Sequence, residues 1–196
     1  MNIILFDGIY HKNLLPLTYT RPVAELRIGM LTIKQKWEQY VENPIQIKTQ
    51  EYLAKKFGSP SEENSIGINA SILPSDDLMS SLLELKNKQI LTSKGKIVAV
   101  NPLPINSKNI EEALSEYKMV ETKAEFLQVE NVWDLFRLND QAIRADIELI
   151  KAAKTFVTPS PTNQILGNDI YIEEGAKVEC AILNTTTGPI YIAKGA

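Results

Sequence analysis

Three cationic residues follow the first apolar segment of the chain, and their types suit the binding of phosphate. Lys12, Arg21 and Arg27 fall within sixteen residues, and the acids close to them are Asp7 and Glu25. Arginine offers a two-pronged set of N–H donors to a phosphate, whereas lysine acts as a point charge. Charged loops are common, so the alternative is that these are solvated loop charges. These three cations favour an anionic ligand, and the alternative of solvated loop charges stays open.

Gly8 stands just before these cations, and the backbone N–H groups around it can add donors for the same phosphate. A single glycine forms neither the G-x-G-x-x-G pattern nor a Walker loop, so this signal is weak. The chain has one histidine, His11, and one cysteine, Cys180. A Ser-His-Asp or Cys-His arrangement would have to use His11, and a histidine-rich metal site is excluded. No intrachain disulfide can form, which fits a reducing compartment.

The elements that position these residues begin with a buried strand over residues 2–6, which ends at the turn Asp7-Gly8. Helical spacing of apolar residues predicts a helix over residues 30–41, with Trp37 on its buried face. The pair Lys94-Gly95 predicts a hairpin between two apolar runs. Ser75 predicts the start of another helix, because a serine caps the free N–H groups there. Further strands are expected over residues 45–47, 66–73, 89–91, 97–100 and 126–129, and further helices over residues 51–57, 75–85 and 131–150.

This alternation of strands and helices predicts an α/β fold with a mostly parallel sheet. Ligands of such sheets bind beyond the carboxyl ends of the strands, so the loop over residues 7–21 is the first place to look for a site. We expect His11 to lie in that open loop. Trp37 and Trp133 fall on apolar helical faces and are expected in the core.

The last forty residues have a different pattern. Residues 169–176 read DIYIEEGA and residues 189–196 read PIYIAKGA, so five of eight positions match at an offset of twenty. Small apolar residues about six apart, namely Ile172, Val178 and Ile190, indicate hexapeptide coils of a parallel β-helix. The alternative is a hairpin with chance similarity. Cys180 sits at a repeat position and is expected to be a packed side chain.

The expected domains are an α/β domain over residues 1–155, a linker over residues 156–164, and the start of a β-helix over residues 165–196. A solenoid needs about three repeats to be stable, and the chain stops inside its second copy. We therefore expect the chain to be the front part of a longer natural protein.

The composition of the 196 residues is that of an ordinary globular protein, with 44% hydrophobic and 23% charged residues. The net charge of −3 argues against a nucleic-acid binder that relies on a broad basic surface. No stretch approaches the roughly eighteen apolar residues of a membrane span. The first apolar run stops at Asp7, which is too short for a signal peptide. These features predict a cytoplasmic protein with neither nucleic acid nor membrane as a partner.

The run L-P-L-T-x-x-R-P, from Leu15 to Pro22, follows the first strand and its loop and precedes a helix. It resembles the opening of sugar-1-phosphate nucleotidyltransferases, which typically read L-x-x-G-x-G-T-R-x-x-P-L-T followed by a Pro-Lys pair. Many members carry a left-handed β-helix after the catalytic domain, as in the architecture of the bifunctional N-acetylglucosamine-1-phosphate uridyltransferase and of glucose-1-phosphate thymidylyltransferase-like proteins. The runs TYTRPVAELRIGMLTIKQKWE and ILNTTTGPIYI are similar to a shorter bacterial branch with these two domains.

The resemblance implies a Rossmann-like nucleotidyltransferase domain followed by the first coils of a left-handed parallel β-helix. In the implied reaction, an oxygen of a sugar-1-phosphate attacks the α-phosphorus of a nucleoside triphosphate and pyrophosphate leaves. Positioning and charge neutralisation by Mg²⁺, arginine and lysine would supply the catalysis. A homo-oligomer, a trimer in the full-length protein, is also implied. The implied catalytic residues are Arg21, Arg27 and Lys12, and the implied nucleotide-binding residues are Phe6, Asp7, Gly8 and Asn69.

The chain departs from the family pattern at several positions. The second glycine and the arginine of the loop are absent, and Val23 stands where the lysine is expected. The N-G-D segment of the family, whose aspartate holds Mg²⁺, aligns with residues 69–71, where Ser71 is a poor ligand for a hard cation. The metal ligands, the base and the sugar therefore stay unknown. A second hypothesis is a catalytically degenerate domain that binds substrate or regulates a β-helix acyltransferase.

Overall fold

The computed structural model describes residues 1–61, 64–107 and 113–196 and contains two compact units. The first unit spans Met1–Asn139 and the second spans Asp140–Ala196. The first unit is a mixed α/β domain built on a six-stranded sheet, and the second contains four short strands.

The sheet of the first unit has the strand order β4-β1-β5-β7-β6-β8. Strand β1 pairs in parallel with β4 and β5, and β6 pairs in parallel with β8, whereas β7 is antiparallel to both of its neighbours. Within this sheet β7 therefore runs against the other five strands, and the expected largely parallel α/β fold is confirmed. The bounds are β1 Ile3–Phe6, β4 Gln46–Lys48, β5 Ile66–Asn69, β6 Gln89–Ser93, β7 Lys96–Asn101 and β8 Lys118–Glu121.

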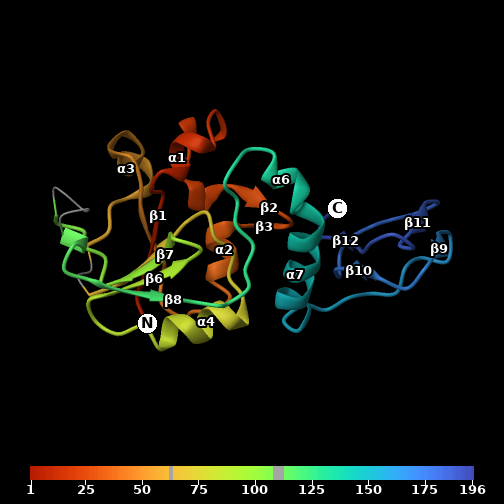
Figure 1. Cartoon of the computed structure of the whole chain (residues 1–196). Helices are drawn as coiled ribbons and strands as arrows, with labels where there is room; N and C mark the ends of the chain where they lie inside the picture. Colours follow the sequence, from red (N-terminus) through yellow and green to blue (C-terminus); the bar gives the residue numbers. More distant parts are fainter. Residues whose placement is uncertain (62–63, 108–112) are drawn as a thin grey trace. The chain divides into compact units, whose positions relative to one another are not determined.

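The chain runs from β1 to β4 on one side of β1 and then crosses to β5 on the other side. This reversal is a topological switch point, and in open α/β sheets such points form a crevice at the carboxyl ends of the strands. Figure 1 shows α1 and α3 beyond the carboxyl end of β1 and α4 toward the opposite end of the sheet. The helices are α1 Tyr10–Asn13, α2 Ile33–Trp37, α3 Glu51–Phe57, α4 Asp76–Leu83, α6 Asp134–Arg137 and α7 Asn139–Lys151, with 3-10 turns η1 Leu17–Tyr19 and η2 Val23–Glu25.

The helix predicted over residues 30–41 is shorter in the structure. Gly29 and Met30 form the turn between β2 (Arg27–Ile28) and β3 (Leu31–Thr32), so the helix cannot begin at Met30. Thr32 and Gln35 form a capping box that starts α2. Trp37 is fully buried as expected, and its Nε1 donates to the carbonyl of Ile72 at 2.9 Å.

The turn at Lys94-Gly95 joins β6 and β7 as predicted, with φ of 51° and 75°. Positive φ at both central residues suits a two-residue hairpin turn. Ser75 caps α4 as predicted, since its Oγ accepts from the backbone N–H of Leu78. The strand predicted over residues 126–129 is wrong, because this segment forms a single bridge, Gln128 with Ile72. Strand β8 was not predicted.

The helix predicted over residues 131–150 is divided into α6 and α7, with Leu138 between them. Asp134 accepts from the backbone N–H groups of Glu130 and Asn131, which fixes the start of a separate turn. No residue of α6 is buried, and Trp133 at its N-cap is 59% exposed. The expectation that Trp133 lies in the core is therefore wrong.

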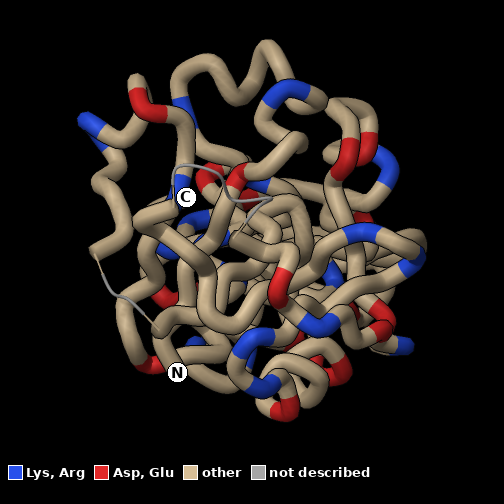
Figure 2. The backbone as a smooth tube through the Cα atoms, turned by 60° about the vertical axis from the view of Figure 1, so that its left-hand side comes forward, with Lys and Arg blue, Asp and Glu red and all other residues tan. Residues whose placement is uncertain are grey.

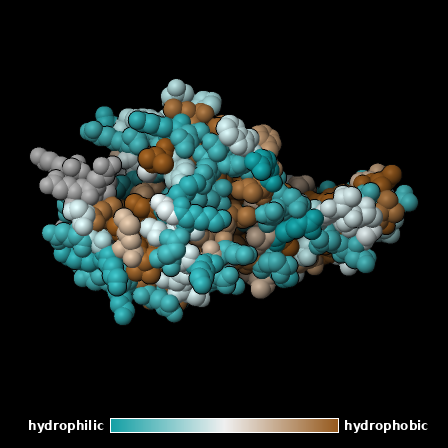
Figure 3. Space-filling view, viewed as in Figure 1, coloured by the Kyte–Doolittle hydropathy of each residue, from teal (hydrophilic) through white to brown (hydrophobic). Residues whose placement is uncertain are grey.

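Charge and hydropathy are mixed over the surface. Figure 2 shows basic and acidic positions interspersed along the backbone, in keeping with the small net charge. Figure 3 shows hydrophobic residues in separate patches on a mostly hydrophilic face. Among the described residues, no helix combines the length and the apolar character that a membrane crossing requires.

One face of the sheet packs a buried cluster formed by Ile4, Ile90, Val100 and Leu103. Gly67 lies on β5 beside this cluster, and a Cβ added there would lie 2.7 Å from the Cβ of Leu103. The side chain of Leu103 packs against Gly67 because residue 67 has no side chain.

We predict that Gly67→Ala lowers the free energy of unfolding by about 2 kcal/mol, because the new methyl group overpacks the cluster. Urea unfolding measures this change. In the double variant Gly67→Ala/Leu103→Gly the clashing side chain, its Cβ included, is removed, so the cost of Gly67→Ala should largely disappear. Equal costs of Gly67→Ala with and without Leu103 would contradict this explanation.

The second unit contains two parallel strand pairs. Strand β9 (Gln164–Leu166) pairs with β11 (Ile182–Asn184), and β10 (Ile170–Ile172) pairs with β12 (Ile190–Ile192). Ile170 lies opposite Ile190, so the repeat at an offset of twenty brings equivalent residues side by side. Hairpin strands are antiparallel, so the hairpin alternative is wrong. Cys180 is exposed and has a φ of 54°, which contradicts the expected packed side chain.

Glu173 joins three parts of the second unit. Its carboxylate accepts from the hydroxyl of Tyr191 and the backbone N–H of Lys194, and Lys154 lies 2.9 Å away. These donors, with Tyr191 first, lower the pKa of Glu173 from 4.5 to about 2. Burial and the nearby carboxylate raise the pKa of Tyr191 to about 12.

A depressed carboxyl pKa stabilises the fold above the unfolded-state pKa, and this contribution is lost as pH falls through the folded-state value. We predict that the unfolding temperature of the second unit falls between pH 4.5 and about 2. Glu173→Gln should lack this part of the pH dependence, so the wild-type and variant curves converge at the acid end. Calorimetric scans over this range test it, and parallel curves would contradict it.

Candidate functional site

The carboxyl ends of β1 and β5 bring together four of the residues predicted from the sequence. Phe6 lies opposite Asn69 in the parallel register, and the N–H of Ala70 donates to the carbonyl of Phe6 at 2.9 Å. Asp7 and Gly8 continue from Phe6 into the loop, with Gly8 at a φ of 54°. These residues lie together at the carboxyl ends of the two strands on either side of the switch point.

Asp7 is 1% exposed, and both of its carboxylate oxygens have protein partners. Oδ1 accepts from the backbone N–H of Val23 at 2.9 Å. Oδ2 accepts from the hydroxyl of Thr49 at 2.6 Å and lies 3.2 Å from Nδ1 of His11. The carboxylate therefore joins the end of β1 to η2, to the end of β4 and to α1.

Burial is the largest influence on the Asp7 carboxyl and raises its pKa above 3.8. The hydrogen bonds from Thr49 and Val23 and the nearby His11 lower the pKa and offset part of that effect. The protein thus holds a carboxylate in a poorly solvated place by surrounding it with donors.

His11 was expected in an open loop, and this expectation is wrong. It lies in α1 and is 6% exposed, because its ring fits between Asp7 and Tyr52. Its Nε2 lies 3.2 Å from the hydroxyl of Tyr52, whose single proton can be donated either to this nitrogen or to the carbonyl of Thr18, 3.4 Å away. The hydroxyl of Thr18 in turn donates to the carbonyl of His11 at 2.6 Å. Asp7, His11 and Tyr52 form a continuous polar chain, referred to below as the Asp7–His11–Tyr52 chain.

The predicted cations are not all gathered at this point. Lys12 is exposed on α1 next to His11, and Arg21 is exposed two residues before the η2 residue that bonds to Asp7. Arg27 belongs to β2, where its guanidinium donates to the carbonyl of Met30 and closes the hairpin turn. The segments of Lys12 and Arg21 are tied to Asp7, whereas Arg27 stabilises a separate hairpin.

Asn69 is 3% exposed and holds the loop that follows β5. Its Oδ1 accepts from the backbone N–H and the hydroxyl of Ser71, and its Nδ2 donates to the carbonyl of Ile97 at 3.2 Å. Gln128 donates to the Ser71 hydroxyl at 3.0 Å. The amide of Asn69 is therefore engaged at both ends by the protein.

Lys48 adds a cation that sequence reasoning missed. It is the last residue of β4, in register with Phe6 of β1, and its Nζ donates to the carbonyl of Ile105 at 3.1 Å. Partial burial lowers the pKa of its ammonium group. The signal available in the sequence was a lysine directly after the apolar strand residues 45–47.

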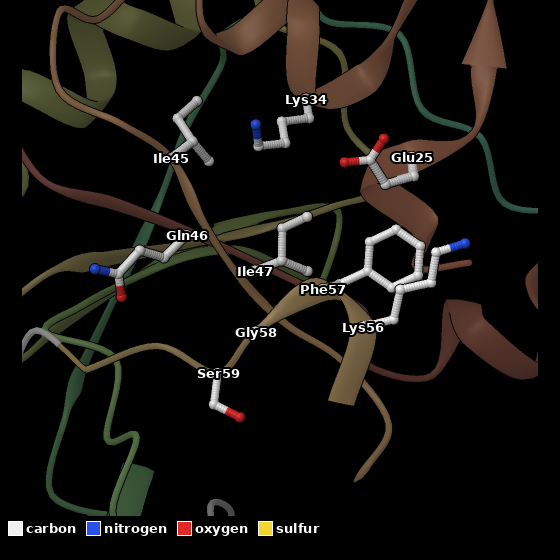
Figure 4. Close-up of a pocket in the computed structure, with 9 residues that line it drawn as sticks. All are labelled: Glu25, Lys34, Ile45, Gln46, Ile47, Lys56, Phe57, Gly58 and Ser59. Carbon is white, nitrogen blue, oxygen red and sulfur yellow. The ribbon is translucent and has the colours of Figure 1, made fainter. Parts of the chain in front are cut away.

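A separate cavity of about 390 Å³ runs along the edge strand β4. Figure 4 shows Ile47 and Phe57 near its centre, with the carboxylate of Glu25 and the ammonium group of Lys34 on one side. Glu25 lines this cavity and has no ion pair to a described residue. None of the predicted site residues lines it. The other lining residues are Ile45, Gln46, Lys56, Gly58 and Ser59.

Residues 3–155 match the model of a protein family described as sugar nucleotidyl transferase. The chain belongs to this family. The match covers the six-stranded sheet and the loop that carries Asp7 and Arg21. No curated protein matches the chain.

The sugar nucleotidyl transferase family implies Mg²⁺, and the residues present do not fit it. Within the described ranges, no three His, Cys, Asp or Glu side chains come together, so the chain offers no cage of its own for a metal. Ser71 has the place of the expected metal carboxylate, is fully buried and is engaged by Asn69 and Gln128. The oxygens of Asp7 are occupied by protein donors. The donor set at this edge therefore lacks the carboxylates that a hard cation prefers.

We predict that Asp7→Ala lowers the free energy of unfolding by about 3 kcal/mol, because it leaves the donors of Val23, Thr49 and His11 without an acceptor in the interior. Urea unfolding followed by circular dichroism measures the change. Asp77→Ala, which removes an exposed carboxylate on α4, is the control and should change stability by less than about 0.5 kcal/mol. Equal effects of the two substitutions would contradict this role of Asp7.

Proposed function

We propose that the chain is a sugar-1-phosphate nucleotidyltransferase that converts a nucleoside triphosphate and a sugar-1-phosphate into a nucleotide-sugar and pyrophosphate. The observation that supports this most is the family match over residues 3–155. The carboxyl ends of β1 and β5 lie inside that match, at the edge of the sheet where open α/β folds bind ligands.

In the proposed reaction an oxygen of the sugar-1-phosphate attacks the α-phosphorus, and the bond from that phosphorus to the bridging oxygen of the β-phosphate breaks. The electron pair leaves with pyrophosphate. Arg21 would bind the triphosphate through two N–H donors, and Lys12 would neutralise part of its charge. The backbone around Gly8 would approach the phosphates closely, because no Cβ stands there. Arg27 would have to exchange its bond to Met30 for a phosphate oxygen.

In this proposal three residues shape the site and do not bind the phosphates, namely Phe6, Asp7 and Asn69. Phe6 supplies the strand end against which the nucleotide rests. Asp7 and Asn69 hold the loops after β1 and β5, since their side-chain atoms bond to the protein. These roles require no metal held by the chain.

A second candidate is a domain of this family that binds nucleotide without transferring it. The buried Ser71 favours it, because its hydroxyl stands where the family pattern has a metal-binding carboxylate. Such a domain would present substrate to, or regulate, a further part of the protein, such as a β-helix acyltransferase. The two candidates differ in turnover and agree in nucleotide binding.

We also propose that residues 165–196 start a left-handed parallel β-helix, with a trimer as the state of the full-length protein. The parallel pairs β9–β11 and β10–β12 support stacked coils, because each pair joins segments about one repeat apart. The handedness and the trimer come from the family resemblance.

Pyrophosphate release tests the proposed function. The chain is incubated with each common nucleoside triphosphate and a panel of hexose-1-phosphates, with Mg²⁺ and separately with EDTA. We predict turnover for at least one pair and a loss of at least tenfold in Arg21→Ala, since the transition-state charge then lacks its bidentate donor. Arg137→Ala, which removes another exposed arginine of the first unit, is the control and should retain full activity.

Three results separate the candidates. If Arg21→Ala and Arg137→Ala reduce turnover equally, Arg21 is not part of the site. Nucleotide binding without turnover for any pair would favour the second candidate. Neither binding nor turnover, from protein shown to be folded, would exclude both.

A further inference from the structure

Tyr52 carries an exposed aromatic ring whose far end is held by the protein. The residue is 54% exposed, yet its hydroxyl lies 3.2 Å from Nε2 of His11 and 3.4 Å from the carbonyl of Thr18. The rings of Tyr52 and His11 meet edge to face, with centroids 6.2 Å apart. A surface tyrosine normally keeps its rotamer freedom, whereas these contacts restrict this one.

His11, which contacts the hydroxyl of Tyr52, is itself fixed by a buried carboxylate. Nδ1 of His11 lies 3.2 Å from the carboxylate of Asp7, which also accepts from Thr49 and from the backbone of Val23. When Nδ1 carries the proton, it donates to Asp7 and leaves Nε2 as an acceptor for the hydroxyl of Tyr52. The orientation of an exposed ring thus depends on two buried side chains.

The ring lies close to the groups proposed to bind phosphate. Tyr52 is in the first turn of α3, just after β4 ends, and its contacts with His11 and Thr18 place it against the loop that follows β1. Lys12 is the neighbour of His11, and Arg21 follows Thr18 by three residues. A flat aromatic face next to cations suits a nucleotide. The base can stack on the ring, and the phosphates can pair with the cations.

We propose that Tyr52 is the surface on which the base of the nucleotide stacks, and that Asp7 and His11 are positioning residues that fix its ring. This inference rests on the proposed function, since it takes a nucleotide as the ligand. A ring that is already oriented loses little conformational entropy when the ligand binds. Every base has a π-face, so the contact itself serves purines and pyrimidines alike.

The test compares ligands that carry a nucleoside with one that has the phosphates alone. Calorimetry measures the binding of each common nucleoside triphosphate and of inorganic tripolyphosphate to the whole chain. Tyr52→Ala should weaken nucleoside triphosphate binding about tenfold or more and leave tripolyphosphate binding unchanged. Phe136→Ala removes another exposed aromatic ring, on α6, and is the control that should change neither affinity.

Two further variants test whether the contact between His11 and Tyr52 fixes the ring. Tyr52→Phe keeps the ring and removes the hydroxyl. His11→Asn keeps a donor toward Asp7 and removes the acceptor at Nε2. Each should weaken nucleoside triphosphate binding about fivefold, and the double variant should be no weaker than either one, because both break the same bond. The tripolyphosphate affinity of Tyr52→Phe should stay at the wild-type value.

The outcomes distinguish this inference from the proposed function. If the wild-type chain binds nucleoside triphosphates and Tyr52→Ala binds them equally well, the stacking surface is elsewhere and the proposed function stands. If Tyr52→Ala loses both ligands to the same extent, Tyr52 supports the fold and does not contact the base. Additive losses in the double variant would overturn the positioning roles. Absence of any nucleotide binding by the wild-type chain would overturn the proposed function together with this inference.

Discussion

The buried carboxylate of Asp7 is the interaction on which the candidate site depends. It stands at the end of strand β1 and accepts from η2, from the residue after β4 and from α1. Three segments therefore converge on two oxygen atoms. A carboxylate in the interior is costly unless donors surround it. The same donors that reduce this cost also set the path of the loop, and Lys12 and Arg21 are carried by that loop.

The site therefore combines buried polar side chains, which bond within the protein, with other groups that face solvent. Asn69 holds the second loop as Asp7 holds the first, and both residues use their polar atoms inside the protein. The groups left facing solvent include the cations, the ring of Tyr52 and the side chains of Ile9 and Tyr19. This division suits a ligand that is bound mainly by charge and stacking, and it explains how the fold can form at this edge without a metal held by carboxylates.

Local signals in the sequence predicted the parts of the fold that local chemistry determines. Lys94-Gly95 predicted its hairpin and Ser75 its helix start, because turn and cap preferences act over a few residues. Strand β8 was missed because its residues are mostly exposed and give no alternation of apolar residues. His11 and Tyr52 are 41 residues apart, so their contact arises from the pairing of β1 with β4, which no single segment encodes. Lys48 was missed for the same reason, since only the register places it beside Phe6.

The strand order also constrains when the site can form during synthesis. Strand β1 emerges first, but its partners β4 and β5 end at residues 48 and 69. Neighbours that are far apart in the sequence form late, because a long loop must close before the contact is made. The edge of the sheet that carries the candidate site cannot form until the ribosome has released both partners, and until β5 is released the strand β1, which reads IILF, keeps at least one unpaired edge. A nascent chain paused before residue 69 would therefore be a substrate for chaperones that bind short apolar strands.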